Sequence, residues 1–322
     1  MRVIEKQVGG HITLLFSIHS DSHRLTRQGS RGAGFCVKEG VSVKLWSVEG
    51  DGGKPTLSCK VTDYCGKVIS GNCKEQYEML LKELEIVGLI PQDGQQIVLE
   101  VQLHLPVSQG FGMSAAGLLA TGNALAEYYQ FEDGHISSRV SHRVERRRSS
   151  GLGDILALDV GGVELRLEPG APPEPGYAVS FPGECQAVLV WAQEENRHTK
   201  GYIDDENWKK MITIAGEEAV GRLSEGTWGS HRWQELLDEA EAFAKKSELL
   251  SESHRAELLE SVKGTICELG VEDVVRPALC MLGTSVAILP CDLEHLPSEV
   301  RLLGLIDALV AQGYSASLTH LQ

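Results

Sequence analysis

The chain has 322 residues, of which 30 are lysine or arginine and 45 are aspartate or glutamate, so its formal net charge is −15. This acidity argues against a general binder of nucleic acid or of an anionic membrane surface, because both partners require a basic face. The length is ample for two domains of about 150 residues with full hydrophobic cores, so the fold needs neither disulfides nor a structural metal.

The charge is unevenly distributed along the chain. Residues 1–172 have a net charge of −2, whereas residues 173–322 have a net charge of −13. A strongly acidic region disfavours anionic ligands, because like charges repel. We therefore expect anion-binding chemistry in the first half and a solvated acidic surface in the second.

The cysteines and the apolar segments indicate where in the cell the protein is expected. Eight cysteines are present, but no two are spaced as Cys-x-x-Cys, and Cys36 lies in an apolar stretch between Phe35 and Val37. We expect reduced structural thiols, as in cytoplasmic proteins. The N-terminal residues lack the apolar segment of a secretion signal, and no apolar run approaches the ~20 residues of a membrane span. These features predict a cytoplasmic protein without a membrane anchor.

The first half of the chain contains both strand-like and helix-like patterns. Apolar residues alternate between 97 and 105 and indicate a half-buried strand, whereas helical spacing between 73 and 87 indicates an amphipathic helix. Glu39 and Gly40 separate two strand-like runs and predict a hairpin turn. In chain order we expect strands at 12–18, 35–38, 41–48, 97–105 and 163–167, and helices at 73–87, 114–129, 136–147 and near Asp154.

The second half follows the strongest linker signal in the sequence, residues 168–176, Glu-Pro-Gly-Ala-Pro-Pro-Glu-Pro-Gly. The helical pattern at 233–247 has one apolar face, which indicates core packing or the face of a homodimer. The whole pattern predicts two α+β domains, at 1–172 and 173–322. In the second we expect a strand at 187–192, mainly helices to residue 269, a strand at 285–289, a helix at 298–312 and a strand at 315–320.

The most informative segment is 106–117, Pro-Val-Ser-Gln-Gly-Phe-Gly-Met-Ser-Ala-Ala-Gly, between a predicted strand and a predicted helix. Its glycines let the backbone approach a ligand, and the free N–H groups and dipole of a helix N-terminus attract an anion such as phosphate. Leu118 stands where a Walker A loop has Lys, and Ala115 where the dinucleotide fingerprint has its third Gly. The segment indicates either a phosphate site of another kind or a tight turn of small residues.

Three further segments contain residues suited to chemistry. Asp154 follows a glycine turn at a predicted helix start, where its carboxylate could cap the helix or orient a substrate hydroxyl during phosphoryl transfer. Arg31 lies among the glycines of residues 27–34, which form either an ordinary loop or a cradle in which the guanidinium binds a carboxylate. A glycine turn at 281–285 precedes a predicted strand and is a weak signal by itself.

In this order, these segments resemble the motifs of the GHMP kinase superfamily. Its first motif, Pro-x-[His/Lys]-[Ile/Val]-[Thr/Asn], appears as Gly-His-Ile-Thr at 10–13; its second, Pro-x-x-x-Gly-[Leu/Phe]-Gly-x-Ser-[Ala/Gly]-Ala, matches 106–116; its third, a glycine-rich turn, matches 281–285. The archaeal pantoate kinase branch adds Gly-Ser-Arg-Gly-Ala-Gly, matched at 29–34, and Gly-Leu-Gly-Asp, matched at 151–154. The resemblance implies the α+β GHMP kinase two-domain fold, with an N-terminal ribosomal protein S5 domain 2-like catalytic domain and a C-terminal ferredoxin-like α+β domain.

The resemblance also implies a reaction, in which ATP phosphorylates the primary hydroxyl of pantoate to give 4-phosphopantoate for coenzyme A synthesis. Asp154 would be the catalytic base or orienting group, and Ser114 would bind Mg²⁺. The residues implied to line the acceptor site are His11, Thr13, Ser30 and Arg31. The residues implied to bind the ATP phosphates are Gly110, Phe111, Gly112, Met113, Ser114, Ala115 and Ala116.

One position departs from the family in a way that affects the metal. Related kinases have a Mg²⁺-binding Glu eleven residues before the catalytic Asp, where this chain has Arg143, and Glu145 is the nearest carboxylate. Residues two apart on a helix point about 200° away from each other, so Glu145 is not a simple replacement. Either Mg²⁺ binds through Ser114, the ATP phosphates and water, or Arg143 itself neutralises phosphate charge.

Two other functions remain open at this point. The chain could be a GHMP kinase for another small hydroxy compound, such as homoserine or mevalonate, or a catalytically weak regulatory homologue, which Arg143 would favour. The five arginines within residues 139–148 indicate a solvated helix face, with one or two side chains that could face phosphate.

Overall fold

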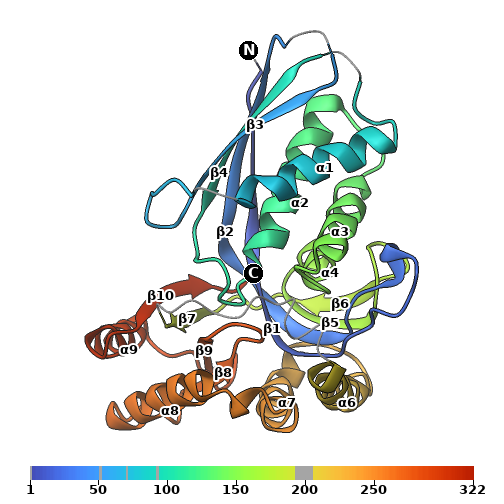
Figure 1. The fold of residues 1–322 in the computed structure, drawn as a ribbon. Coiled ribbons are helices and arrows are strands. Elements are labelled where there is room, and N and C mark those ends of the chain that lie inside the picture. The colour runs from blue at the N-terminus through green and yellow to red at the C-terminus, as the bar shows by residue number, and fades with distance from the viewer. Residues whose placement is uncertain (1, 51–52, 70–71, 92–93, 193–205) are drawn as a thin grey trace.

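The structure is a computed structural model that describes residues 2–50, 53–69, 72–91, 94–192 and 206–322. Two β-sheets form its framework. Figure 1 shows the larger sheet in the upper half with helices on one face, and the smaller sheet below it with helices beneath. None of the helices in the described ranges is long and apolar enough to cross a membrane.

The larger sheet has six strands in the order β3-β4-β2-β5-β6, and β1 pairs with β2 outside this path. Only the β3–β4 pair is parallel, and α1 connects its two strands. The strands are β1 (Ile4–Phe16), β2 (Gly32–Val48), β3 (Thr56–Thr62), β4 (Gln96–Leu103), β5 (Val163–Glu168) and β6 (Tyr177–Phe181). The helices of this half are α1 (Glu75–Ile86), α2 (Met113–Tyr129), α3 (Ile136–Arg148) and α4 (Asp154–Val160).

The hairpin predicted at Glu39 and Gly40 is wrong, because β2 runs through both residues as one strand. The pairing of β1 with β2 shifts register between Gly9 and Gly10, opposite this point. A Cβ atom on Gly40 would lie 2.1 Å from the carbonyl oxygen of Val8. The glycines therefore permit a close crossing and a bulge rather than a chain reversal.

The smaller sheet is antiparallel and has the strand order β10-β7-β9-β8. In chain order, helices lie between its first and second strands and between its third and fourth strands. This is the ferredoxin-like β-α-β-β-α-β arrangement that the resemblance implied. The strands are β7 (Gln186–Trp191), β8 (Val275–Leu279), β9 (Ser285–Pro290) and β10 (Ser315–His320). The described helices are α6 (Glu206–Leu223), α7 (Trp233–Lys246), α8 (Ser253–Glu268) and α9 (Glu299–Ala311).

The proline-rich segment before residue 177 does not connect the two sheets. It lies between β5 and β6, which are paired in the larger sheet, so that sheet extends beyond the expected boundary at residue 172. The backbone N–H of Ala171 donates to the carbonyl oxygen of Thr26 at 2.9 Å, which holds the segment against the first half. The change from the larger to the smaller sheet takes place between β6 and β7.

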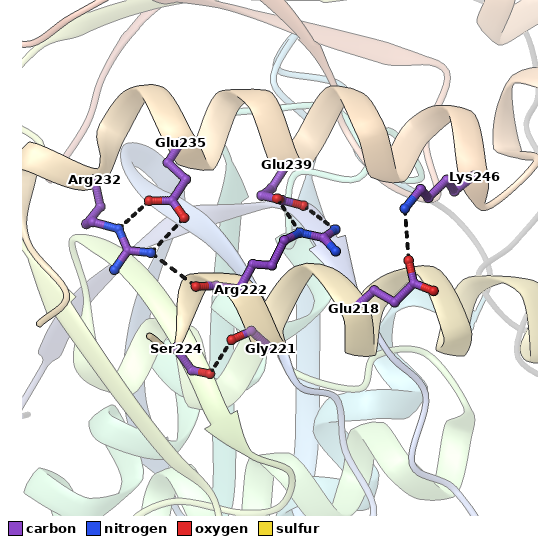
Figure 2. Close-up of polar contacts among 8 residues, drawn as sticks. All are labelled: Glu218, Gly221, Arg222, Ser224, Arg232, Glu235, Glu239 and Lys246. Carbon is purple, nitrogen blue, oxygen red and sulfur yellow. Dashed lines mark hydrogen bonds and ion pairs between the residues drawn. The ribbon is translucent and has the colours of Figure 1, made fainter. Parts of the chain in front are cut away.

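Ion pairs join α6 to α7, as Figure 2 shows. Arg222 on α6 binds Glu239 on α7 through Nε and Nη2, at 2.5 and 2.7 Å, and Lys246 binds Glu218 at 2.8 Å. Arg232 also pairs with Glu235 at the start of α7. Part of the acidity of the second half thus lies in inter-helix pairs rather than in unpaired surface charge.

Helix α6 packs closely against β1, and we expect Gly216→Ala to destabilise the protein. A Cβ atom at Gly216 would lie 2.0 Å from the carbonyl oxygen of Phe16. Such overpacking should lower the free energy of unfolding by about 1–3 kcal/mol, measured by chemical denaturation. Gly221 on the same helix has nothing within 4 Å, so Gly221→Ala should raise stability by up to about 1 kcal/mol. Equal effects of the two substitutions would contradict this packing.

Candidate functional site

A cavity of about 570 Å³ brings the five sequence motifs together. Thr13 enters it from β1 and Ser30 from the segment before β2, while residues 106–108, 110–115 and 149–154 form much of the wall. Met281 and Leu282 contribute from the glycine turn of the second half. Segments that are far apart in sequence, including the weak third motif, therefore share one site.

The glycine-rich loop before α2 has the geometry of an anion site. Gly110 and Gly112 have φ angles of +76° and +69°, which other residues adopt only with strain. A Cβ on Gly110 would also lie 2.7 Å from the carbonyl oxygen of Met281, so the loop packs directly on the second half. Gly112 precedes α2 and no side chain caps the helix, which leaves the N–H groups of its first turn for an anion.

Two residues of this loop act as anchors through their side chains. Phe111 is buried, and its ring packs edge-on against Trp191 of β7 with 5.8 Å between ring centroids. Its carbonyl oxygen accepts a hydrogen bond from the backbone N–H of His11. Ser114, in the first turn of α2, donates to Oε1 of Gln76 at 3.0 Å and lines the cavity.

Asp154 begins α4 and places its carboxylate at the cavity wall. Its Oδ1 lies 2.7 Å from Nδ1 of His11. Burial alone would raise the pKa of Asp154, but the hydrogen bond and charge of His11 outweigh it, so the pKa lies below its usual value. Asp154 is therefore anionic at neutral pH, as a group that orients a hydroxyl must be.

The four residues expected at the acceptor site lie in different places. Thr13 and Ser30 line the cavity. His11 is fully buried and lies behind Asp154 rather than in the cavity wall. Arg31 is not among the lining residues; its Nε donates to the carbonyl oxygen of Leu167 and its Nη1 pairs with Glu217.

Glu217 on α6 is a residue that the sequence analysis did not identify. Its Oε1 accepts a hydrogen bond from the hydroxyl of Ser17 at 2.6 Å and lies 3.0 Å from Nε2 of His19, while its Oε2 binds Arg31. Burial would raise its pKa, but the hydrogen bonds of Ser17 and His19 and the charge of Arg31 lower it. The second half thus holds Arg31 in place through a carboxylate.

Glu145 and Arg143 point to opposite sides of α3, as their spacing predicted, but it is Glu145 that faces the cavity. Arg143 pairs with Glu83 of α1 at 2.8 Å and is not among the lining residues, so the idea that it neutralises phosphate charge is not supported. Burial and the nearby charge of Asp154 raise the pKa of Glu145 to about 8, against the hydrogen bond of Ser114. Glu145, Ser114 and Asp154 therefore lie close together at one wall.

Glu164 and Arg166 on β5 were also missed. Both are fully buried, and Nη1 of Arg166 lies 2.7 Å from Oε1 of Glu164. Within the described part of the chain, Nε and Nη2 of Arg166 have no hydrogen-bond partner. A Cβ on Gly153 would meet both this Nε and the hydroxyl of Ser30, so the guanidinium lies directly behind the cavity wall. Alternating polar residues on a strand usually indicate a solvent-facing side, which concealed this pair.

The comparisons with known proteins agree with these motifs. A sequence model of the GHMP kinases N terminal domain matches residues 73–162. A pantoate kinase of Methanospirillum hungatei is 35% identical over 167 residues, which are 50% of this chain and 52% of that protein. A pantoate kinase of Thermococcus kodakarensis is 28% identical over 252 residues, 77% of each chain. In its match to the Methanospirillum relative, the chain spans about half that protein's length.

Solved structures share the fold over nearly the whole chain. A structure described as a phosphotransferase related to the CoA biosynthesis pathway has a TM-score of 0.77 at 20% identity and covers 99% of this chain and 96% of its own. Homoserine kinase from Cytophaga hutchinsonii has a TM-score of 0.63 at 15% identity, with 99% and 95% covered. At these identities the likeness concerns the fold alone. Residues 73–162 therefore match the GHMP kinases N terminal domain, several of the sequence motifs meet at one cavity, and the fold shared with the solved structures extends over nearly the whole chain.

Proposed function

We propose that this protein transfers the γ-phosphoryl group of ATP to the primary hydroxyl of pantoate, in the cytoplasm. The observation that carries the proposal is the meeting of the uncapped α2 N-terminus and the anionic Asp154 at one cavity. The relatives named pantoate kinase support the choice of acceptor. We also propose that a catalytic first unit ends after β6 and that the smaller sheet and its helices form the second unit.

The nucleotide phosphates fit the loop before α2. The backbone N–H groups at the start of α2 and the flexible glycines provide hydrogen-bond donors and room for a close approach, and the helix dipole attracts negative charge. Arg148 also lines the cavity, where it pairs with Glu75 at 2.7 Å, and adds positive charge on that side. Residues 110–116, with Arg148 nearby, would therefore bind a triphosphate without a Walker A lysine.

Mg²⁺ fits the oxygen atoms of Ser114 and Glu145. In the described residues no cluster of three or more His, Cys, Asp or Glu side chains could hold a metal, so the ion would take its other ligands from the ATP phosphates and water. Bound there, Mg²⁺ would neutralise phosphate charge. The raised pKa of Glu145 means that metal binding would displace a proton from this carboxyl. With Glu145 as this ligand, the departure at Arg143 would no longer favour a catalytically weak homologue.

The acceptor fits on the other side of Asp154, near Thr13 and Ser30. Asp154 would orient the hydroxyl and accept its proton as the phosphoryl group moves to the oxygen. Catalysis of this kind depends on positioning and on charge neutralisation more than on covalent chemistry. The guanidinium of Arg166, directly behind the wall at Ser30 and Gly153, would make this end of the site favourable for a carboxylate. Arg31 lies outside the lining and is paired with Glu217, and it would add positive charge from behind.

A substrate panel tests the proposal. ADP release should be measured with ATP and Mg²⁺ against pantoate, homoserine and mevalonate at equal concentrations. We expect kcat/KM for pantoate to exceed the other values by at least about 10²-fold, because an acceptor that leaves buried polar groups unpaired is strongly rejected. Preference for homoserine or mevalonate would assign the protein to another branch of the superfamily.

We expect Arg31→Ala to raise the KM for pantoate by about 10–100-fold while kcat changes little, since a charge-assisted hydrogen bond is worth roughly 1.5–3 kcal/mol. Steady-state kinetics with saturating ATP measures both constants. Arg27→Ala is the matched control, because Arg27 lies in the same segment but is exposed, whereas Arg31 is half-buried and bonded to the Leu167 carbonyl and to Glu217. An unchanged KM in Arg31→Ala would remove Arg31 from the carboxylate site.

A further inference from the structure

Four charged or titratable side chains form a continuous network of hydrogen bonds and ion pairs behind the cavity. Asp154 binds Nδ1 of His11 at 2.7 Å, Nε2 of His11 lies 2.9 Å from Oε1 of Glu164, and the same oxygen lies 2.7 Å from Nη1 of Arg166. His11, Glu164 and Arg166 have no exposed surface, and only Asp154 reaches the cavity. The proposed reaction uses Asp154 and the positive charge of Arg166, but it gives no role to His11 or Glu164.

The geometry determines the protonation of His11. Each ring nitrogen lies within hydrogen-bond distance of a carboxylate oxygen, and carboxylates only accept hydrogen bonds. A neutral ring would present a lone pair to one of them. Nη1 of Arg166 is farther from Nε2, at 3.3 Å, than Glu164 is, so Glu164 is the better partner. The ring is therefore an imidazolium between two anions.

The groups around His11 balance this charge. Burial lowers the pKa of His11, but the hydrogen bonds to Asp154 and Glu164 raise it above its usual value. Cys36, which pairs with His11 across β1 and β2, has a raised pKa and stays neutral. Together the four side chains carry two negative and two positive charges, so that each buried ion is paired with an opposite charge, as buried ions require.

Two glycines at the start of β2 leave space for these four side chains. Gly34 and Gly32 lie opposite Glu164 and Arg166 in the β2–β5 pairing. A Cβ on Gly34 would lie 3.1 Å from Oε1 of Glu164, and one on Gly32 would lie 2.5 Å from Nη2 of Arg166. Two of the glycines in the motif at 29–34 thus leave room for buried side chains, rather than forming a cradle for a ligand.

We propose that Glu164 is a positioning residue for catalysis: it keeps His11 protonated, so that His11 fixes Oδ1 of Asp154 and leaves Oδ2 for the acceptor hydroxyl. This proposal rests on the proposed kinase function for its catalytic consequence. Its structural part, a doubly protonated His11 held by Glu164, can be tested on the free protein. The two parts can therefore fail separately.

The structural part is tested by ¹⁵N NMR of the imidazole nitrogens in the protein without ligand at pH 7.5, with His11→Gln to identify the signals. We expect both nitrogens of His11 to bear protons, and Glu164→Gln to convert the ring to a neutral form. A neutral ring in the unsubstituted protein would overturn the proposal whatever the protein phosphorylates.

The catalytic part is tested by Glu164→Gln, which keeps the shape and removes the charge. We expect kcat to fall about tenfold or more with the KM for ATP unchanged, as for other residues that orient an active group through a histidine. In an Asp154→Asn background, Glu164→Gln should lower the residual kcat no further, because it acts through Asp154. Equal losses in both backgrounds, or a normal kcat in Glu164→Gln, would overturn it.

Glu83→Gln is the matched control for the loss of a buried, ion-paired carboxylate. Glu83 is 4% exposed and binds Arg143 and Arg147 at 2.8 Å each, outside the cavity. It should reduce thermal stability and leave kcat unchanged. If both Gln variants lowered kcat alike, the effect of Glu164 would be one of stability, and the positioning role would be rejected.

Discussion

Asp154→Asn is expected to lower kcat by about 10²–10⁴-fold, the usual contribution of a positioned acid or base. Asparagine retains an oxygen that can accept from His11, so the local hydrogen bond and the fold should survive. The substitution would remove the negative charge that we propose to orient the acceptor hydroxyl, and with it the group that would accept the hydroxyl proton. The measurement is ADP release under saturating ATP, Mg²⁺ and pantoate, together with circular dichroism.

Asp159→Asn is the control for this substitution, because Asp159 lies on the same helix, is exposed, and binds the hydroxyl of Ser138 away from the cavity. It should retain normal turnover. If Asp154→Asn retained normal turnover as well, another group would have to orient the hydroxyl, and the assignment of Asp154 would fail.

Glu145→Gln should lower kcat by about 10²-fold at ordinary Mg²⁺ concentrations, since a neutral amide is a much weaker ligand for a hard cation. Excess Mg²⁺ should restore part of the activity. Arg143→Ala is the matched control on the same helix, because Arg143 binds Glu83 rather than facing the cavity. A greater loss in Arg143→Ala than in Glu145→Gln would mean that the arginine acts on phosphate after all.

The same variant should also change how stability depends on pH in the metal-free protein. The pKa of Glu145 rises from 4.5 to about 8 on folding, so between these values the folded chain holds a proton that the unfolded chain has released. The resulting stability is fully present below pH 4.5 and is lost as the pH rises through 8. In EDTA, the Tm of the unsubstituted protein should therefore fall from pH 5 to pH 8, and it should fall less in Glu145→Gln.

Regular patterns in the sequence predicted most of the framework. The alternation at 97–105 corresponds to β4, and the helical spacings at 73–87 and 136–147 correspond to α1 and α3. Three strands were missed for physical reasons. β3 and β6 each have only one buried residue, and β8 contains Pro277, which weakens a strand pattern. Their positions depend on pairing with neighbours that are distant in sequence.

The residues that line the cavity could be predicted where they form a local sequence motif, and could not where their position depends on the direction of a side chain. The glycine loop and Asp154 could be identified because each lies where a helix is predicted to begin, and their residue types suit anion binding and proton transfer there. The family's spacing of eleven residues before the catalytic aspartate places the metal ligand at Arg143. In the structure, however, the orientation of α3 makes Glu145 face the cavity. Glu164 and Arg166 could not be found from β5 alone, because their burial depends on the glycines of β2 opposite them.

The central claim is that phosphate is transferred to the primary hydroxyl of pantoate, and ³¹P NMR of the isolated product tests it most directly. A phosphate on the primary hydroxyl is attached to a CH₂ group, so we expect a phosphorus triplet from coupling to two protons. A doublet from coupling to one proton would place the phosphate on the secondary hydroxyl and contradict the assigned geometry. Free phosphate with no phosphorylated pantoate would contradict the proposed function itself.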